Sequence, residues 1–390
     1  MASLKTRIVF TATTPFAVNA FLTSHLQALA KNYDVLLCVN LHAYALTPAL
    51  KNKVRVFHID FARKIAPIHD VRALLQLLWV LWRERPAAIH SITPKAGLLS
   101  MLAASLLSVP HRYHTFTGQV WANRRGLSRS MLKSFDRWIF RLATRVLADS
   151  PSQCRLLENE KIVREGVVSV LGLGSISGVD LERFHPDREL RDVERVAANT
   201  PPSTRVYLFV GRLARDKGVF DLLAAFSSVA SGNDQVELWM VGPDDEGLLP
   251  QLQEMAGRGV GRVRWVGATP QPERYMAAAD IFVLPSYREG FGSVIIEAAA
   301  CGIPSIAYRI DGVVDAVLDG HTGILVPERD VDALALAMRS LAVEDQRRSV
   351  LGRQARIRAV EEYSSTRVTA AWLGFYAREL YGVGGDEFIG

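Results

Sequence analysis

Short apolar runs alternate along the chain with longer segments in which apolar residues recur at helical spacing. Continuous runs of four to six apolar residues are typical of parallel strands buried on both faces of a sheet. The segments between them predict helices that cover those faces. In the first half of the chain the runs are residues 7–11, 34–39, 54–59, 88–91, 111–116 and 145–149.

The alternation begins again after a glycine-rich stretch, residues 171–186, which predicts a linker. We therefore expect an α/β fold of two doubly wound, Rossmann-like domains that face each other across a cleft. An amphipathic final helix, about residues 365–381, is long enough to return to the first domain. The expected domains are residues 1–175, completed by about 365–390, and residues 176–364. The second-half runs are residues 206–210, 236–241, 263–266, 281–284, 305–308 and 323–326.

The composition indicates a well-packed chain with a sizeable core, since 49% of its 390 residues are hydrophobic and 22% are charged. Cys38, Cys154 and Cys301 are widely spaced, which excludes a disulfide framework or a cysteine-based zinc site. The N-terminus leads directly into the first apolar run without the hydrophobic region of a signal peptide. The apolar stretch at residues 73–82 is too short to cross a bilayer. These features predict a cytoplasmic protein.

The charge is unevenly distributed. Residues 1–165 carry 23 Lys and Arg against 9 Asp and Glu, so the remainder of this chain of net charge +6 is acidic. A large anionic partner is therefore expected to meet the first half only. Residues 121–145 concentrate cations against Asp136 alone, with aromatic residues between them, which is typical of an interfacial helix on anionic lipid. These cations are Arg124, Arg125, Arg129, Lys133, Arg137, Arg141 and Arg145.

Two alternatives to lipid binding apply to residues 121–145. The stretch could be a solvated helix face that is packed by its aromatic residues. Nucleic acid is the less favoured partner, because no recognised nucleic-acid-binding module accompanies the cations.

A strand, a turn with two glycines and a helix follow one another at residues 280–301. Gly290 and Gly292 would let a ligand approach the backbone, and Ser293 is the predicted N-cap of the helix. The unpaired amides at a helix start suit a phosphate or another anionic group. Glu289 and Glu297 would face the same space, which suggests a polyhydroxylated ligand there. The alternative is an ordinary capped helix with one acid favoured by the helix dipole and one in a solvated loop.

A second strand end, at residues 209–218, again places a glycine and charged residues at a helix entrance. Arg212 and Lys217 could both reach one diphosphate, Arg212 through its forked guanidinium and Lys217 as a point charge. Neutralising a diphosphate leaving group is what an enzyme acting on a sugar nucleotide needs most. The alternative is a pair of solvated surface charges.

These motifs together resemble the signature set of retaining glycosyltransferase family 4. The set comprises residues 211–218, Glu289 with Glu297, the stretch Gly-His-Thr-Gly-Ile-Leu-Val at residues 320–326 and the linker Gly-Val-Asp at residues 178–180. The resemblance covers the second half almost continuously and implies the GT-B fold. In the first half, the stretch His-Ser-Ile-Thr-Pro-Lys-Ala-Gly at residues 90–97 resembles the bacterial members that extend glycans on polyprenyl diphosphate, as in O-antigen and capsule assembly.

The resemblance also implies roles for individual residues. Arg212 and Lys217 would bind the donor diphosphate, Glu297 would accept hydrogen bonds from the ribose hydroxyls, and Glu289 would face the donor sugar. Backbone amides would hold sugar hydroxyls or phosphate. Those amides belong to Gly290, Phe291, Gly292 and Ser293.

The first half departs from the family pattern. Residues 11–16 lack the usual glycine, and Thr117 stands where the family has a histidine, with His114 three residues earlier. We expect His114 to substitute as a catalytic residue with Thr117 beside the acceptor; the alternative is a strand histidine satisfied locally. Lys95, at another helix entrance, is expected to bind the acceptor's diphosphate, unless it is an ordinary surface lysine. In the second half, Asp311 stands where glycine is usual, so the loop at residues 311–315 matches only in part.

The sequence therefore predicts a retaining, metal-independent hexosyltransferase without a cofactor. It would move a sugar from a nucleoside diphosphate sugar, expected to be a UDP-sugar, to an undecaprenyl-diphosphate-linked saccharide at the cytoplasmic face of the inner membrane. Nothing resembles the Asp-x-Asp metal site of the other transferase fold, since Asp244-Asp245 lack its form. The alternatives are a GT-B sugar-nucleotide epimerase or phosphorylase, and a non-catalytic scaffold docked on a membrane.

Overall fold

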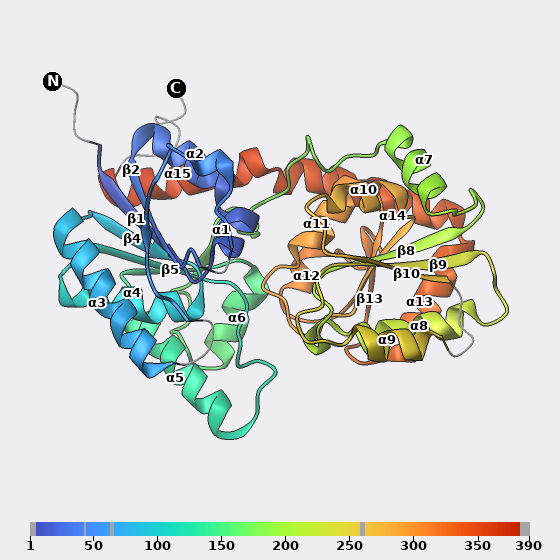
Figure 1. Ribbon diagram of the computed structural model, residues 1–390, viewed down its shortest axis with the longest axis horizontal. Coiled ribbons are helices and arrows are strands. Elements are labelled where there is room, and N and C mark those ends of the chain that lie inside the picture. Colours follow the sequence, from blue (N-terminus) through green and yellow to red (C-terminus); the bar gives the residue numbers. More distant parts are fainter. Residues whose placement is uncertain (1–4, 43, 63–65, 258–261, 383–390) are drawn as a thin grey trace. The chain divides into compact units, whose positions relative to one another are not determined.

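The computed structural model describes residues 5–42, 44–62, 66–257 and 262–382, which form two compact α/β units (Figure 1). Unit 1 comprises the residues up to Ser177 together with the C-terminal segment from Ser365, and unit 2 comprises Gly178–Ser364. Each apolar run that predicted a strand forms one, and each unit has one parallel sheet with helices on both faces. The predicted fold class is confirmed.

The sheet of unit 1 has the strand order β3-β2-β1-β4-β5-β6-β7, and its pairs are parallel. Its first strand, β1, is buried in every position from Ile8 to Ala12, as a continuous apolar run predicts. The short strand β7 has no counterpart among the predicted runs. The strands are β1 (Arg7–Ala12), β2 (Asp34–Val39), β3 (Arg55–His58), β4 (Ala88–Ser91), β5 (His111–Phe116), β6 (Arg145–Ala148) and β7 (Ser169–Val170).

Two helical layers cover this sheet, and alternate residues of β1 contact different layers. Val9 joins the core beneath α3, α4 and α5, whereas Ile8 and Phe10 join the core beneath α2 and α15. Figure 1 shows α3, α4 and α5 on one side of the sheet and α2 and α15 on the other. The helices are α1 (Pro15–Phe21), α2 (Thr23–Asn32), α3 (Pro67–Glu84), α4 (Pro94–Leu106), α5 (Gly126–Leu142), α6 (Pro151–Asn159) and α15 (Ser365–Tyr381), with a 3-10 turn, η1 (Pro48–Leu50).

The final helix, α15, belongs to unit 1 because its aromatic residues fill the core of that unit. Trp372 and Tyr376 are almost completely buried. The Tyr376 hydroxyl lies 2.6 Å from Nδ1 of His90, whose ring also stacks on Phe10. Each fully buried aromatic side chain contributes about 1.5–3 kcal/mol to folding, so α15 is an integral part of this domain.

The sheet of unit 2 has the order β10-β9-β8-β11-β12-β13, the doubly wound arrangement in which the first strand lies beside the fourth. Its strands are β8 (Arg205–Val210), β9 (Val236–Val241), β10 (Arg262–Gly267), β11 (Ile281–Leu284), β12 (Ser305–Tyr308) and β13 (Gly323–Val326). Its helices are α7 (Arg188–Ala197), α8 (Val219–Ala230), α9 (Leu249–Ala256), α10 (Pro272–Ala278), α11 (Ser293–Ala300), α12 (Val313–Ala316), α13 (Val331–Val343) and α14 (Asp345–Tyr363), with a 3-10 turn, η2 (Arg215–Lys217).

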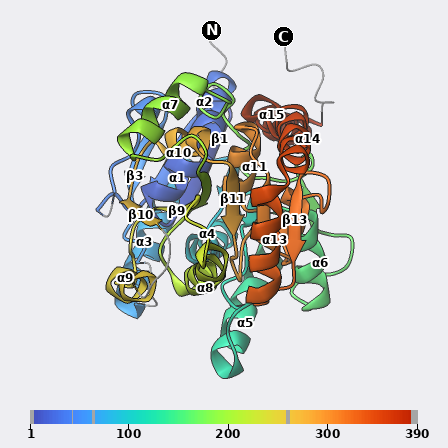
Figure 2. The same cartoon turned by 90° about the vertical axis from the view of Figure 1, so that its right-hand side faces the viewer.

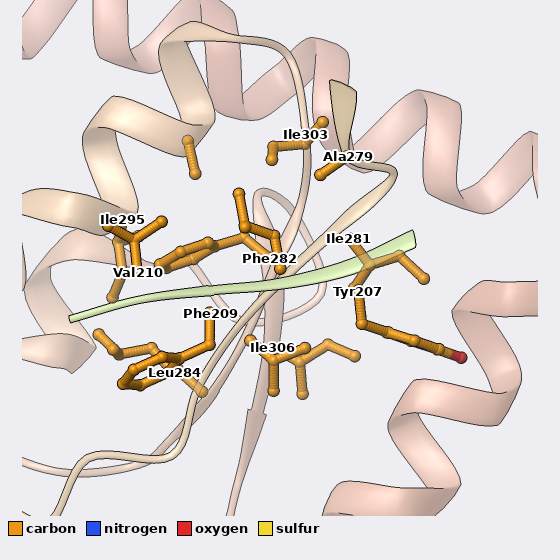
Figure 3. Close-up of a cluster of buried hydrophobic side chains, with 14 of the residues drawn as sticks. Tyr207, Phe209, Val210, Ala279, Ile281, Phe282, Leu284, Ile295, Ile303 and Ile306 are labelled. Carbon is orange, nitrogen blue, oxygen red and sulfur yellow. The ribbon is translucent and has the colours of Figure 1, made fainter. Parts of the chain in front are cut away.

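The helices of unit 2 also form two layers. Figures 1 and 2 both show α10 and α11 above the sheet and α8 and α9 below it. In the buried cluster of Figure 3, Val210 of β8 lies on the same side of that strand as Ile295 of α11, whereas Phe209, Leu284 and Ile306 lie on the opposite side. At one edge of this core the carboxylate of Asp280 binds both Arg191 and Arg195, each at 2.6 Å. That pairing attaches α7 to the amino end of β11. The carboxyl end of β11 is followed by a loop.

Candidate functional site

The two sequence motifs of the second half meet at one place, the carboxyl ends of β8 and β11. The loop at residues 211–218 follows β8, and the loop at residues 285–292 follows β11. Because β8 and β11 are neighbours while their connections leave in opposite directions, this is the topological switch point of the sheet. Ligands of doubly wound sheets bind at such points.

The two loops touch through their backbones. Gly218 has φ +66°, and a Cβ there would lie 1.9 Å from the carbonyl oxygen of Pro285. The amide of Tyr287 donates a hydrogen bond of 2.9 Å to the carbonyl of Asp216. Only glycine permits this approach, so the sequence Lys217-Gly218 places a lysine directly against the turn that carries Glu289.

A lysine–glutamate ion pair links the loops. Nζ of Lys217 lies 2.6 Å from Oε1 of Glu289, and both side chains are more than four-fifths buried. Arg288 joins the same group through Asp216 at 3.0 Å. The pair holds both side chains at the switch point. There each side chain could exchange its contact within the pair for a contact with a ligand.

Arg212 lies in the same loop as Lys217, and its guanidinium is close to two carboxylates. Its guanidinium lies 3.6 Å from Asp216 and 3.8 Å from Asp245, which is too long for hydrogen bonds. Among the described residues none accepts a hydrogen bond from Arg212, and about a third of its side chain is exposed. A guanidinium with free N–H groups next to a lysine is a suitable receptor for a diphosphate.

The start of α11 differs from the prediction in one respect. Ser293 is the first residue of the helix and not its N-cap; Gly292 is the N-cap, with φ 75° and ψ 51°, and no side chain caps the helix. A serine cannot adopt this left-handed conformation without strain, which is why glycine occupies the position. The first amides of α11 are consequently left without a side-chain acceptor, as an anion-binding helix start requires.

The loop after β12 supports the turn that carries Glu289, a contact that its partial match to the family pattern did not predict. A Cβ on Gly312, which has φ +87°, would lie 2.5 Å from the carbonyl oxygen of Gly290 and 2.8 Å from that of Glu289. Gly312 therefore lets its loop close directly onto the Glu289 turn. A glycine soon after the predicted strand at residues 305–308 was the signal that could have found it.

Glu297, one turn into α11, is partly buried and carries a perturbed carboxyl group. Burial raises its pKa to about 7, while Arg183 acts to lower the pKa and Glu273 to raise it. Arg183 is itself paired with Glu273 at 2.7 Å. No residue of the described part of unit 2 donates a hydrogen bond to the Glu297 carboxylate. Its oxygens are thus able to accept from hydroxyl groups of a ligand.

The candidate residues of unit 1 do not converge in the same way. His114 is 1% exposed, with Nδ1 2.7 Å from Oγ of Ser91 and its ring against Gly97, where a Cβ would lie 2.5 Å away. Burial lowers the pKa of His114 to about 3, so it stays neutral. This environment favours the alternative, a strand histidine satisfied locally, and the catalytic role expected for His114 stays a prediction. Thr117 donates to the carbonyl of Ile92 at 3.1 Å.

Lys95 lies at the rim of a cavity of about 470 Å³. Its Nζ is 2.6 Å from Oδ1 of Asp70, which lines the same cavity. Thr13 and Thr93 add hydroxyl groups. Most of the remaining wall is apolar and comes from α4, α5 and the loop after β5: Leu98, Leu99, Val120, Trp121, Leu132 and Phe135. The cavity could receive a ligand with both hydroxyl and hydrocarbon surfaces.

The basic stretch at residues 121–145 has two parts with different surroundings. Arg129 and Lys133 both bind Glu160, at 2.8 and 2.6 Å, and flank the buried Trp121, so this part packs inward. Trp121 donates to Asp136 at 2.7 Å, and burial raises the pKa of that carboxyl to about 7. The cations that follow line a separate cavity of about 740 Å³. They are Arg137, Arg141, Arg145, Lys161 and Arg164.

One group in the described residues has the composition of a metal site. Ligand atoms of His42, His58 and Asp60 lie within 4.8 Å of one another. However, Nδ1 of His58 lies 3.2 Å from the amide of Leu41 and Nε2 lies 2.9 Å from Asp60, so both ring nitrogens are already used. Asp60 also binds Arg72 at 2.8 Å. This is a satisfied hydrogen-bonded cluster in unit 1.

None of the helices in the described parts of the chain is both long enough and apolar enough to cross a bilayer. The apolar stretch at residues 73–82 lies within α3. The expectation that it does not span a membrane agrees with this finding.

Comparison with known proteins identifies both halves. Residues 17–174 match the model of the glycosyl transferase 4-like domain, and residues 204–344 match the model of glycosyl transferases group 1. The capsular polysaccharide biosynthesis glycosyltransferase CapM of Staphylococcus aureus is 29% identical over 79% of this chain and 80% of its own length. The UDP-Gal:alpha-D-GlcNAc-diphosphoundecaprenol alpha-1,3-galactosyltransferase of Escherichia coli is 27% identical over 75% of this chain and 76% of its own length.

Solved structures show the same fold. Sucrose-phosphate synthase of Thermosynechococcus elongatus has a TM-score of 0.78 over 97% of this chain and 100% of its own, at 22% identity. Anabaena HepE in complex with UDP-glucose has a TM-score of 0.78 with the same coverage, at 18% identity. At these identities the likeness establishes the fold alone. Taken with the two family models and the order of motifs around Glu289, it shows that the chain belongs to glycosyltransferase family 4, with the GT-B fold.

Proposed function

We propose that this glycosyltransferase is a retaining, metal-independent enzyme that moves a sugar from a UDP-sugar to an undecaprenyl-diphosphate-linked saccharide in the synthesis of a cell-surface polysaccharide. The observation that carries the proposal is the Lys217–Glu289 pair at the switch point of unit 2, in whose loop Arg212 also lies, at 3.6 Å from Asp216. Two cations at one point suit a diphosphate, and the carboxylate beside them suits a sugar.

Binding of the donor would rearrange the charges at this point. The diphosphate would take Lys217 and the free N–H groups of Arg212, and the amides at the start of α11 would hold phosphate or sugar oxygens. Glu289, released from Lys217, would accept hydrogen bonds from the donor sugar. Glu297 would accept from the ribose hydroxyls.

In the proposed reaction the bond between C1 of the sugar and the diphosphate oxygen breaks, and its electron pair leaves with UDP. An acceptor hydroxyl attacks C1 from the same face, and its proton passes to the departing phosphate oxygen. Arg212 and Lys217 would stabilise the charge that develops on the diphosphate, which is the largest contribution expected from the protein. Their two positive charges support a reaction that needs no metal ion.

Relatives support the substrates. The Escherichia coli galactosyltransferase is named for UDP-Gal as donor and a diphosphoundecaprenol-linked GlcNAc as acceptor, and CapM is named for capsular polysaccharide synthesis. The solved HepE complex contains UDP-glucose. For an acceptor with a polyprenyl anchor, we propose peripheral attachment at the cytoplasmic face of the membrane. The cations of α5 supply attraction to anionic lipid, and Lys95 and Thr117 are proposed to face the acceptor.

The test is a transfer assay with the purified full chain, in which UDP- and GDP-sugars are screened by mass spectrometry against a polyprenyl-diphosphate-linked GlcNAc. We expect one sugar to be added from a UDP-sugar, with an α linkage by NMR from an α-linked donor and with no loss of rate in EDTA. Glu289→Ala should abolish transfer, whereas Glu361→Ala, at an exposed glutamate of α14, should not.

Three results would overturn the proposal. Isomerisation of the UDP-sugar without acceptor would indicate an epimerase, and phosphate-dependent cleavage of a glycan would indicate a phosphorylase. Unchanged glycan assembly in cells that carry Glu289→Ala would indicate a non-catalytic scaffold.

A further inference from the structure

The outward face of α3 is apolar along its whole length. Its inward face, which includes Ala73, Leu77 and Leu81, fills the core of unit 1, so the helix is apolar on both sides. The outward side chains recur at intervals of three and four residues, which places them in one stripe. This stripe is Ile68, Val71, Leu75, Trp79 and Trp82, with exposed fractions of 85%, 58%, 61%, 49% and 63%.

A contiguous stripe of this kind differs from the single exposed apolar residues that are normal on soluble proteins, and such patches are often functional. Its two tryptophans lie at the carboxyl end, where Arg83 stacks on the ring of Trp79 at 5.2 Å. Tryptophan and arginine together are typical of the level of lipid headgroups, because both have an apolar body and a polar end.

The charges around the stripe favour an anionic partner. Arg72 and Arg83 are exposed at its edges. The two acids of α3 are turned away from solvent: Asp70 binds Lys95, and Glu84 is buried against Arg7 and Arg55. Among the described residues of α3, therefore, no exposed side chain is acidic.

The size of the stripe argues against a second copy of this chain as the partner. A helix of 18 residues is about 27 Å long, and a face about 10 Å wide would bury roughly 300 Å². A stable dimer needs about 800 Å² from each partner. A bilayer surface has no such requirement, since a helix that lies in it buries its apolar face alone and gains further attraction from neighbouring cations.

Such neighbouring cations lie on α5. The helix α4 packs between α3 and α5, and Figure 1 shows the three helices on one side of the sheet. On α5, Leu127 is 90% exposed and Trp138 53% exposed, with Arg141 over the Trp138 ring at 6.0 Å. Asp70 of α3 also lines the cavity beside Lys95. One helical layer thus combines an apolar stripe, a basic helix and the predicted acceptor cavity.

We propose that the outward stripe of α3 is the main membrane-docking surface of this chain, lying in the headgroup region of an anionic bilayer, with the cations of α5 contacting the headgroups. This differs from docking through residues 121–145 alone, since Arg129 and Lys133 of that segment are occupied by Glu160. The inference rests on the proposed function only in that a polyprenyl-linked acceptor brings the enzyme to a membrane.

The test measures sedimentation of the full chain with vesicles of phosphatidylcholine, with and without phosphatidylglycerol. The variant Leu75→Gln/Trp79→Gln/Trp82→Gln should lower partitioning at least about tenfold, because each buried apolar side chain favours the lipid by more than that factor. A matched control, Leu336→Gln/Val343→Gln, changes two residues of α13 that are 67% and 76% exposed and should leave partitioning unchanged. Melting temperatures should stay close to wild type in both variants.

Two outcomes overturn the inference: equal vesicle binding by the α3 variant and the wild type, or a wild-type dimer that the α3 variant converts to a monomer, which would make the stripe an interface between copies. Transfer to a short, soluble acceptor is measured on the same samples. If that activity is absent while the α3 variant still loses vesicle binding, the proposed function fails and the docking surface stands. If the transfer activity is present and the α3 variant binds vesicles as well as the wild type does, only the proposal of the docking surface fails.

Discussion

The two units have the same strand order at their switch points, but the loops there have different chemistry. In unit 2 the loops after β8 and β11 carry Lys217 and Glu289, which pair at 2.6 Å. In unit 1 the equivalent loops after β1 and β4 meet through Thr13 and Thr93, whose hydroxyl oxygens lie 2.7 Å apart. The loop after β1 has no glycine, and Thr13 and Thr93 line a mostly apolar cavity.

This difference indicates that the strand order determines where a site lies, whereas the residues of the loops determine which ligand it can bind. Glycines bring the backbone of unit 2 close enough to hold an anion, and cations neutralise it. In unit 1, hydroxyls and a mostly apolar wall, with the Lys95–Asp70 ion pair beside them, suit the saccharide and hydrocarbon parts of an acceptor. Variants that remove a charge, a glycine, a carboxylate or a buried histidine test the contrast at four points.

The largest effect is expected from Lys217→Ala. It removes one of two cations from the proposed diphosphate site and the ion pair that positions Glu289, so kcat/KM should fall about 10²–10³-fold. Steady-state transfer kinetics measure the loss, and UDP calorimetry shows how much of it is binding. Arg215→Ala is the matched control, because Arg215 lies in the same 3-10 turn but stacks on Phe220. Equal losses in the two variants would mean that this turn has a general and not a site-specific role.

The next largest effect is expected from Gly312→Ala. The new Cβ would collide with the carbonyl of Gly290 and displace the turn that carries Glu289, and a displacement of about 1 Å can cost roughly 10²-fold in rate. Gly320→Ala separates collision from backbone strain. Gly320 also has a left-handed φ, +75°, but a Cβ there would meet nothing within 4 Å. A comparable loss in both variants would show that conformation alone, and not contact between the two loops, matters.

The sequence predicted most of unit 2 because its determinants are local. Buried parallel strands appear as apolar runs, and Gly218 and Gly292 mark turns by residue type alone. It missed two features: the closure of Gly312 onto Gly290, which depends on a contact between distant segments, and the N-cap, which lies at Gly292, one residue before the expected Ser293. In unit 1 the position of His114 could not be predicted, since a strand gives no sign of which face a helix such as α4 will cover.

A moderate effect is expected from Glu297→Gln, and it should depend on pH. Burial raises the pKa of Glu297 to about 7, so the carboxylate forms, and affinity for a ribose should increase, as the pH rises through that value. We expect UDP-glucose, whose diphosphate does not titrate in this range, to bind the wild type about tenfold more tightly at pH 8 than at pH 6. Calorimetry should show a nearly flat profile for Glu297→Gln. An unchanged slope would assign the titration to another group.

The smallest effect on turnover is expected from His114→Ala. A catalytic histidine would give a large loss of rate without loss of stability, whereas the buried His114 bound to Ser91 predicts the opposite. Turnover per folded molecule should change less than about twofold, and the free energy of unfolding should fall by about 1–3 kcal/mol because the buried Ser91 hydroxyl loses its shorter hydrogen bond. Ser91→Ala, which removes the same hydrogen bond from the other side, should be less stable in denaturant titrations with its turnover retained. If His114→Ala instead lost about 10²-fold in rate at unchanged stability, the histidine would have to reach the substrate in another conformation, and unit 1 would hold a charged site like that of unit 2.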